Sequence, residues 1–226
     1  MSHQLSFDLP VRPALGRGDF FVSPSNALAV ALIDAPDSWV SGKLVLYGPR
    51  GSGKSHLARV WTDSIGGAVI SATDLFDADI PMLTQHPLAV EDVPAIADAP
   101  DAQTALFHLH NLMLTERRPL LMTGHDAPNL WRLSLPDLQS RVSGTQAIAL
   151  DPPDDALLAA VLAKLFADRQ IIPRPDVIPY LLAHMDRSFE TAARVVAALD
   201  RAALSEGRSL SRPLAIRVLD ALDRDG

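Results

Sequence analysis

The sequence predicts an α/β domain, in which helices flank a five-stranded parallel sheet, followed by a small all-helical domain. Two observations predict this fold class. Between residues 43 and 150, five short apolar runs alternate with helical stretches, which is typical of a parallel sheet covered on both faces. After residue 151, helical patterns continue without a strand-like run between them. We therefore expect a flexible tail over 1–18, an α/β domain over 19–151 and a helical domain over 152–226.

Each element follows from its local sequence. Proline and glycine residues interrupt the tail, and Pro24 is a start signal before an Ala- and Leu-rich helix expected over 25–35. The strands are expected over 43–47, 68–70, 88–90, 120–123 and 147–150, with the main helices between them over 56–65 and 102–116. Asp151-Pro152-Pro153 then breaks the chain. The later helices are expected over 154–169, 176–185, 188–205 and 211–223.

Composition excludes several functional classes. The 226 residues include no cysteine, which excludes a disulfide scaffold, a thiolate zinc site and thiol catalysis. The formal net charge of -7 argues against broad nonspecific binding of nucleic acid. No apolar run approaches the ~20 residues that a membrane-spanning helix needs, and the N-terminus lacks the pattern of a signal peptide. We expect a cytoplasmic protein without a membrane partner.

A glycine-rich loop with the full G-x-x-x-x-G-K-[ST] pattern follows the first expected strand. It consists of Gly48, Pro49, Arg50, Gly51, Ser52, Gly53, Lys54 and Ser55, with His56 next in the chain. Glycines let backbone N–H groups converge on phosphates, and the following helix adds its positive N-terminal end. Lys54 is expected to reach the β- and γ-phosphates, and Ser55 to offer its hydroxyl to Mg²⁺. The loop predicts a site for ATP or ADP, and the alternative is a Gly/Ser turn that matches by chance.

An acidic pair, Glu91 and Asp92, ends the third expected strand. P-loop ATPases hold Mg²⁺, directly or through water, with an acid at the end of a strand near the phosphate loop. Glu91 and Asp92 are therefore candidate catalytic and Mg²⁺-binding residues, although a solvated acidic turn is the bland alternative. Successive strand residues point to opposite faces, so the sequence leaves open which of the two faces the metal.

Together these features resemble the AAA+ ATPases, and within them the clade of the bacterial replication initiator DnaA. The resemblance rests on the phosphate loop, the acidic strand end, the strand over 120–123 and the helical C-terminal part. Residues 19–26 are similar to the first segment of the clade's ATPase domain, and Leu-Pro-Asp-Leu-Gln-Ser-Arg over 135–141 is similar to its arginine-finger box. The resemblance implies an AAA+ P-loop domain followed by a helical lid.

The chain ends at Gly226, directly after the expected lid, so we expect it to lack the DNA-reading domain of DnaA. In this respect it resembles the Hda-type regulatory inactivators of DnaA. That resemblance implies an ADP-bound regulator, at the replisome, that attaches to the replication sliding clamp and makes DnaA hydrolyse its ATP, which prevents over-initiation. It also implies no direct sequence-specific contact with DNA, and analogy with AAA+ cores suggests a homo-oligomer.

In the resemblance, Arg141 is the arginine finger. Such an arginine reaches the nucleotide of a neighbouring subunit, here DnaA, and stabilises charge in the transition state. The alternative is a surface arginine that pairs with Asp137.

The N-terminal tail resembles the peptides that dock on sliding clamps. Its candidate residues are Gln4, Leu5, Ser6, Phe7 and Leu9. An extended peptide can place Leu5 and either Phe7 or Leu9 in an apolar pocket while Gln4 forms hydrogen bonds beside it. An ordinary amphipathic tail is the alternative.

Two places depart from the clade's pattern. His125 stands where the clade has a polar sensor. Either the adjacent Asp126 takes the role or sensing is weakened, and the alternative is that His125 caps the strand end. Glu190 stands where the clade has a nucleotide-facing arginine, and Arg187 and Arg194 are expected to share its helical face. Arg194 is a candidate nucleotide contact, or else it pairs with Glu190. A carboxylate facing a triphosphate is repulsive, so weak intrinsic ATPase activity is expected.

Two other functions compete with the regulator. A helicase-loader-type AAA+ ATPase would remodel DNA and bind single strands, with a salt dependence that counterion release makes obligatory. A small P-loop kinase would transfer a phosphoryl group to a small acceptor.

Overall fold

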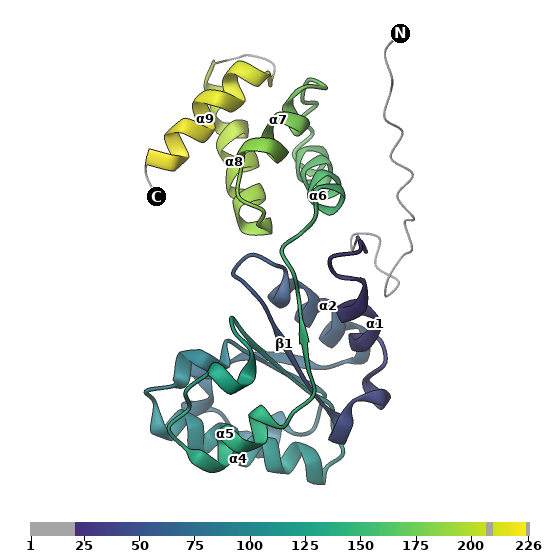
Figure 1. Ribbon diagram of the computed structural model, residues 1–226, viewed down its shortest axis with the longest axis vertical. Helices are drawn as coiled ribbons and strands as arrows, with labels where there is room; N and C mark the ends of the chain where they lie inside the picture. The colour runs from purple at the N-terminus through teal and green to yellow at the C-terminus, as the bar shows by residue number, and fades with distance from the viewer. Residues whose placement is uncertain (1–20, 207–209, 225–226) are drawn as a thin grey trace. The chain divides into compact units, whose positions relative to one another are not determined.

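The computed structural model describes residues 21–206 and 210–224 of the chain (Figure 1). The chain divides into two compact units. One is Asn26–Asp151, and the other begins at Pro152 and includes residues 21–25.

The first unit is built on a five-stranded parallel sheet with the strand order β2-β3-β4-β1-β5. The strands are β1 (Lys43–Tyr47), β2 (Ala68–Ser71), β3 (Leu88–Glu91), β4 (Leu120–Gly124) and β5 (Ala147–Ala149). This confirms the expected parallel sheet. Because β4 lies between β1 and β3, the loops that follow β1 and β3 flank the end of β4 at the carboxyl edge of the sheet.

The three central strands are mainly apolar because both of their faces are buried, and their polar residues lie at or beside the strand ends. Every residue of β4 is buried, as are the first four of β1 and the first three of β3, whereas the edge strands β2 and β5 are partly exposed. Four of the expected limits shift by one residue at the carboxyl edge. Strands β2, β3 and β4 end one residue later, at Ser71, Glu91 and Gly124, and β5 ends before Leu150.

Helices cover both faces of the sheet, with α1 and α2 on one side and α4 and α5 on the other (Figure 1). The α-helices are α1 (Ala27–Ile33), α2 (Lys54–Ile65), α3 (Ile80–Leu83), α4 (Pro100–Thr115) and α5 (Pro136–Ser143). Short 3₁₀ turns are η2 (Pro36–Ser38), η3 (Val40–Gly42), η4 (Ala72–Asp77), η5 (Val93–Ile96) and η6 (Pro128–Leu130).

Proline residues explain two of the places where helices differ from the expected limits. Helix α1 ends at Ile33, before the expected residue 35, because Pro36 disfavours helical geometry at the residue before it. Helix α4 begins at Pro100, two residues before the expected start, because the first position of a helix tolerates the missing proline N–H.

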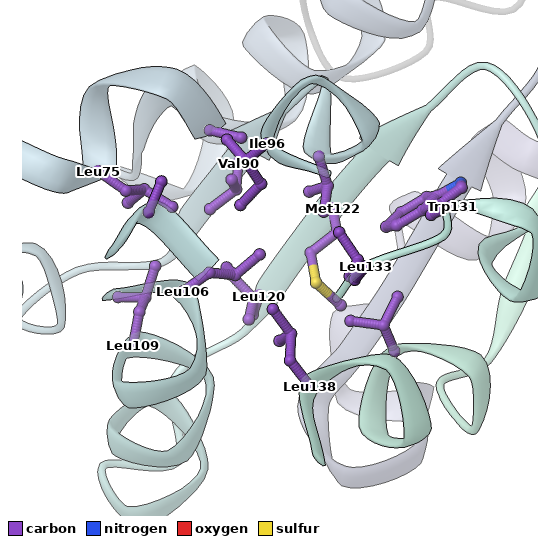
Figure 2. Close-up of a cluster of buried hydrophobic side chains, with 14 of the residues drawn as sticks. Leu75, Val90, Ile96, Leu106, Leu109, Leu120, Met122, Trp131, Leu133 and Leu138 are labelled. Atoms are coloured by element: carbon purple, nitrogen blue, oxygen red, sulfur yellow. The ribbon is translucent and has the colours of Figure 1, made fainter. Parts of the chain in front are cut away.

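One large apolar core lies between the sheet and the α4–α5 side (Figure 2). Leu120 and Met122 from β4 and Val90 from β3 contribute to this core from the sheet, and Leu106 and Leu109 of α4 contribute to it from the helical layer. All five side chains are fully buried. This cluster packs α4 against β4 and against β3, the strand that ends at the acidic pair.

We expect Leu106→Ala to lower the free energy of unfolding by ~2–5 kcal/mol, because it removes buried methyl groups and leaves a cavity. Urea unfolding followed by circular dichroism measures the loss. Leu112→Ala on the same helix is the matched control, since the Leu112 side chain is 36% exposed. Equal losses in the two variants would contradict the packing described for α4.

The second unit is helical. It contains α6 (Asp155–Asp168), α7 (Val177–His184), α8 (Phe189–Glu206) and α9 (Arg212–Arg224), which share a core of buried leucine, valine and alanine side chains with Phe166. Asp154 caps α6 by accepting a 2.8 Å hydrogen bond from the Leu157 amide. Within the described part of the chain, no helix combines the length and apolar character that crossing a membrane requires.

Candidate nucleotide-binding site

The loop between β1 and α2 holds a backbone path that only glycine permits at two points. A Cβ atom on Gly48 would lie 2.2 Å from the carbonyl oxygen of Leu150, so the loop could not leave the sheet so close to the end of β5. Gly53, directly before α2, has a φ of 99°, in the left-handed region. The glycines at these positions therefore serve the backbone geometry of the loop.

The loop delivers the chain to the N-terminus of α2, a helix of 12 residues. The first N–H groups of a helix have no partner within the helix, and they carry its partial positive charge. No side chain caps this end, and the first turn holds no acidic residue. The backbone therefore presents unneutralised N–H donors, which suit a phosphate.

Lys54 begins α2 and folds back over the loop. Its Nζ atom donates hydrogen bonds of 2.7 Å to the carbonyl oxygens of Gly48 and Pro49, and the residue is only 9% exposed. Burial lowers the pKa of the Lys54 ammonium, and the Arg50 charge lowers it further, while Asp92 and Glu91 act in the opposite direction. The lysine thus lies within the electrostatic reach of both candidate carboxylates.

Two polar atoms near this loop are buried without a hydrogen-bond partner in the structure: Oγ of Ser52 and Oε1 of Glu91. A buried polar atom without a partner is destabilising by about 1–3 kcal/mol, so such atoms are rare unless a ligand or water satisfies them. One lies in the phosphate loop and the other ends the strand whose carboxylates act on Lys54. These unsatisfied atoms, together with the glycine-lined backbone, fit a bound nucleotide and its metal ion.

The acidic pair does not continue the strand, so the two carboxylates do not alternate across a sheet. Strand β3 ends at Glu91, and Asp92 has a φ of 55°, in the left-handed region. The Asp92 amide donates a 3.1 Å hydrogen bond to Oγ1 of Thr123, at the carboxyl end of β4. This bond fixes the turn and the direction in which the Asp92 side chain leaves β3.

His125 follows β4 and pairs with Asp92, with 3.5 Å between Nε2 and Oδ1. The position of His125 was predicted from the sequence, but its partner Asp92 and the role of Thr123 were not. A polar residue at the end of an otherwise apolar strand was the signal for Thr123. Gly124, between them, lies against Trp131, whose ring would be 2.6 Å from a Cβ atom.

The remaining predicted loop residues are at the surface. Ser55 and His56 are exposed on the first turn of α2, and Pro49 and Arg50 are exposed in the loop. Ser55 directly follows Lys54, so its hydroxyl is on the same helix end as the free N–H groups.

Arg141 lies elsewhere on the unit. It is exposed on α5, and its guanidinium carbon is 5.1 Å from the centroid of the Phe107 ring on α4. The alternative pair with Asp137 is wrong, because the described residues include no ion pair between them. The Arg141 charge acts on Lys43, at the start of β1, whereas Lys54 follows the end of β1. The structure therefore does not bring Arg141 together with Lys54 of the same chain.

Two expectations for the helical unit are corrected. Arg187 precedes α8, and its Nη2 atom lies 2.9 Å from Oδ1 of Asp155, so Arg187 does not share a helical face with Glu190. Glu190 and Arg194 are exposed and one turn apart on α8, but over residues 21–206 and 210–224 they form no ion pair within 4.0 Å. Arg194 is thus free of the carboxylate that the sequence suggested as its partner.

The predicted clamp-binding residues lie outside the described part of the chain, as do Asp19 and Phe20. These expected residues are Gln4, Leu5, Ser6, Phe7 and Leu9.

No protein-family model matches the sequence. Solved structures do match the fold. Domain III of the replication initiation protein DnaA from Thermotoga maritima superimposes with a TM-score of 0.79 at 18% identity, covering 94% of this chain and 98% of that one. The replication initiator DnaA bound to AMPPCP and single-stranded DNA gives 0.67 at 19% identity, covering 94% of this chain and 68% of that one.

A more distant structure, the AAA domain of FIGL-1 in complex with ADP, gives a TM-score of 0.62 at 10% identity and covers 86% of this chain and 78% of that one. At these identities the similarity shows the fold alone. It confirms the expected AAA+ P-loop fold, in the form found in DnaA.

Proposed function

We propose that this chain is a regulator of replication initiation that binds ADP or ATP with Mg²⁺, docks on the sliding clamp and activates hydrolysis of the ATP bound to DnaA. The observation that carries the proposal is the position of Arg141. Its guanidinium is exposed, pairs with no carboxylate among the described residues, and acts on the amino end of β1 instead of the phosphate loop at the carboxyl end. An arginine so placed is available to a second molecule.

The phosphate loop supports binding of a nucleotide by this chain itself. The N–H groups at the start of α2 and the Lys54 ammonium would hold the phosphates, and the buried Ser52 hydroxyl would gain a partner. Such a lysine acts as a point charge, so it can exchange the Gly48 and Pro49 carbonyls for phosphate oxygens.

Ser55, Glu91 and Asp92 are the residues that would hold Mg²⁺. Mg²⁺ is usually bound by one or two carboxylates together with phosphates and water, and a bound ion neutralises phosphate charge. The unpartnered Oε1 of Glu91 favours Glu91 as the carboxylate that turns to the ion, since Asp92 already faces His125. With Asp92 so engaged and an acidic residue at position 190, we infer weak ATPase activity of the chain alone.

In the complex, DnaA would supply the ATP, the metal ligands and the attacking water, and this chain would supply Arg141. A guanidinium on the γ-phosphate stabilises the charge that develops on its oxygens, and its planar fork matches two of them at once. The tail over 1–18 would tether the chain to the clamp and raise its effective concentration near DnaA on the DNA.

The direct test is turnover of radiolabelled ATP bound to DnaA, in the presence of clamp loaded on DNA, with and without the full chain. We expect clamp-dependent acceleration. Gln4→Ala combined with Leu5→Ala should abolish both clamp binding and acceleration while ADP binding persists. Retained clamp affinity in that variant would show that the tail is not the docking segment.

The same preparation distinguishes the helicase-loader alternative. If the wild-type chain binds ADP and clamp but does not accelerate hydrolysis of DnaA-bound ATP, the proposed regulatory function is wrong. Binding to a single-stranded oligonucleotide that weakens steeply with salt would then identify a DNA-remodelling ATPase.

A further inference from the structure

A buried pair of basic side chains lies between the amino end of β1 and α4. Lys43, the first residue of β1, is 4% exposed, and so is His110 on α4. The Lys43 Nζ and His110 Nδ1 atoms are 3.2 Å apart. No acidic side chain within the described part of the chain comes within 4.0 Å of the Lys43 ammonium. A buried lysine without a counter-charge is rare, because burial disfavours the charged form.

The geometry assigns the protons of this pair. A lysine ammonium can only donate, so Nδ1 of His110 accepts and the ring carries its proton on Nε2. Nε2 is buried without a hydrogen-bond partner. Burial, and after it the charges of Lys43 and Arg141, lower the pKa of His110 to about 4, so the ring is neutral at physiological pH. The positive charge of the pair therefore resides on Lys43.

Arg141 belongs to the same assembly through α4. Phe107, under the Arg141 guanidinium, and His110, bound to Lys43, are three residues apart and so lie on neighbouring positions of one helical face. Lys43 contacts His110 of α4, and the charge of Arg141 on α5 acts on it. On the neighbouring strand β4, the apolar Leu120 lies beside Lys43. The two cations thus differ in their surroundings: Lys43 is buried and contacts His110, whereas Arg141 is exposed and contacts the Phe107 ring.

We propose that Lys43, held by His110, is a positioning residue for Arg141. The buried charge of Lys43 keeps the guanidinium away from the Lys43–His110 pair and on the Phe107 ring, where a phosphate of a partner can contact it. The role of the presented arginine rests on the proposed function, but the positioning itself does not. The repulsion is reciprocal. The Arg141 charge contributes, after burial, to the lowered pKa of Lys43, and the same Coulomb repulsion acts on the guanidinium.

The repulsion between Lys43 and Arg141 predicts how the activation depends on pH. Burial, followed by the Arg141 charge, lowers the pKa of Lys43 to about 8. Below that pH the ammonium is charged and Arg141 is held outward, and above it the charge and the bias disappear. The activation that depends on Arg141 should therefore fall as pH rises through about 8, by roughly threefold to tenfold, since burial accounts for the larger part of the shift.

The test follows the two side chains directly by NMR in the full chain. Protons of the Arg141 side chain are shifted by the ring current of Phe107, and the Lys43 ε-methylene reports its own titration. We expect the Arg141 signals to move in one step between pH 7 and 9, together with Lys43. The step should vanish in Lys43→Met and persist in Lys164→Met, which removes a surface lysine paired with Asp168.

Hydrolysis of DnaA-bound ATP is then measured over the same pH range, after subtraction of the hydrolysis by DnaA without this chain. Wild type and Lys164→Met should lose activation above pH 8, while Lys43→Met should be flat and match the alkaline wild type. Arg141 signals that stay fixed while Lys43 titrates would overturn the proposal, and the wild type alone shows this if Lys43→Met does not fold. A clear Arg141 step without activation at any pH would support the positioning and refute the proposed function.

Discussion

Arg141→Ala is expected to reduce the clamp-dependent hydrolysis of DnaA-bound ATP by about 10³–10⁵-fold, the range typical of arginine fingers. The side chain is exposed on α5 and its visible contact is with the Phe107 ring. Loss of an exposed cation–π contact is worth only about 0.5–1 kcal/mol, so the variant should fold normally. Affinity for ADP and for the clamp should be unchanged, because neither site includes Arg141.

Two further variants sharpen this measurement. Arg141→Lys should restore little, since an ammonium cannot match two phosphate oxygens with a planar fork. Asp137→Ala, on the same helix, should leave the rate within a factor of about two, because the described structure has no ion pair between Asp137 and Arg141. Single-turnover assays at saturating clamp separate the chemical step from assembly. Full activity of Arg141→Ala would refute the trans finger.

The second large effect is expected at Lys54. Lys54→Ala removes the buried ammonium that contacts the Gly48 and Pro49 carbonyls and lies near both carboxylates. Hydrogen bonds to charged groups contribute about 1.5–3 kcal/mol each, so the loss of two phosphate contacts should weaken ADP binding by roughly 10²–10⁴-fold. Isothermal titration calorimetry with Mg²⁺ and ADP measures the difference.

A thermal-shift experiment guards against misreading this loss. A ligand that binds the folded state raises the midpoint in proportion to the logarithm of its concentration over Kd. The unfolding midpoints of wild type and Lys164→Ala should rise with added ADP, whereas Lys54→Ala should need roughly 10²–10⁴-fold more ADP for the same rise. If Lys54→Ala binds ADP as wild type does, the loop is a structural turn that matches the phosphate-loop pattern by chance.

The sequence predicted the α/β unit well because its signals are local and strong. Five apolar runs become five parallel strands, since a strand buried on both faces is mainly apolar. The phosphate loop was equally predictable, because its glycines answer backbone demands that no other residue meets, such as the 2.2 Å approach of a Gly48 Cβ to Leu150.

What the sequence could not give were the pairs made between elements. The contact of His125 with Asp92 joins the ends of β4 and β3, and it depends on the left-handed turn at Asp92. Lys43 reads as an ordinary polar start of a strand, and His110 as an ordinary helix residue, until the fold brings them to 3.2 Å. Helical spacing suggested partners for Glu190, but Arg187 lies before α8 and pairs with Asp155 instead.

The strand order has a consequence for how the protein is made. The phosphate loop springs from β1, near the start of the unit, yet both neighbours of β1 in the sheet, β4 and β5, come late in the chain. Pairings distant in sequence form slowly, and during synthesis the N-terminal part waits for them. During synthesis, β1 and its glycine loop therefore lack their neighbouring strands until most of the unit has left the ribosome. We therefore expect a bound nucleotide to stabilise this unit only after its sheet is complete.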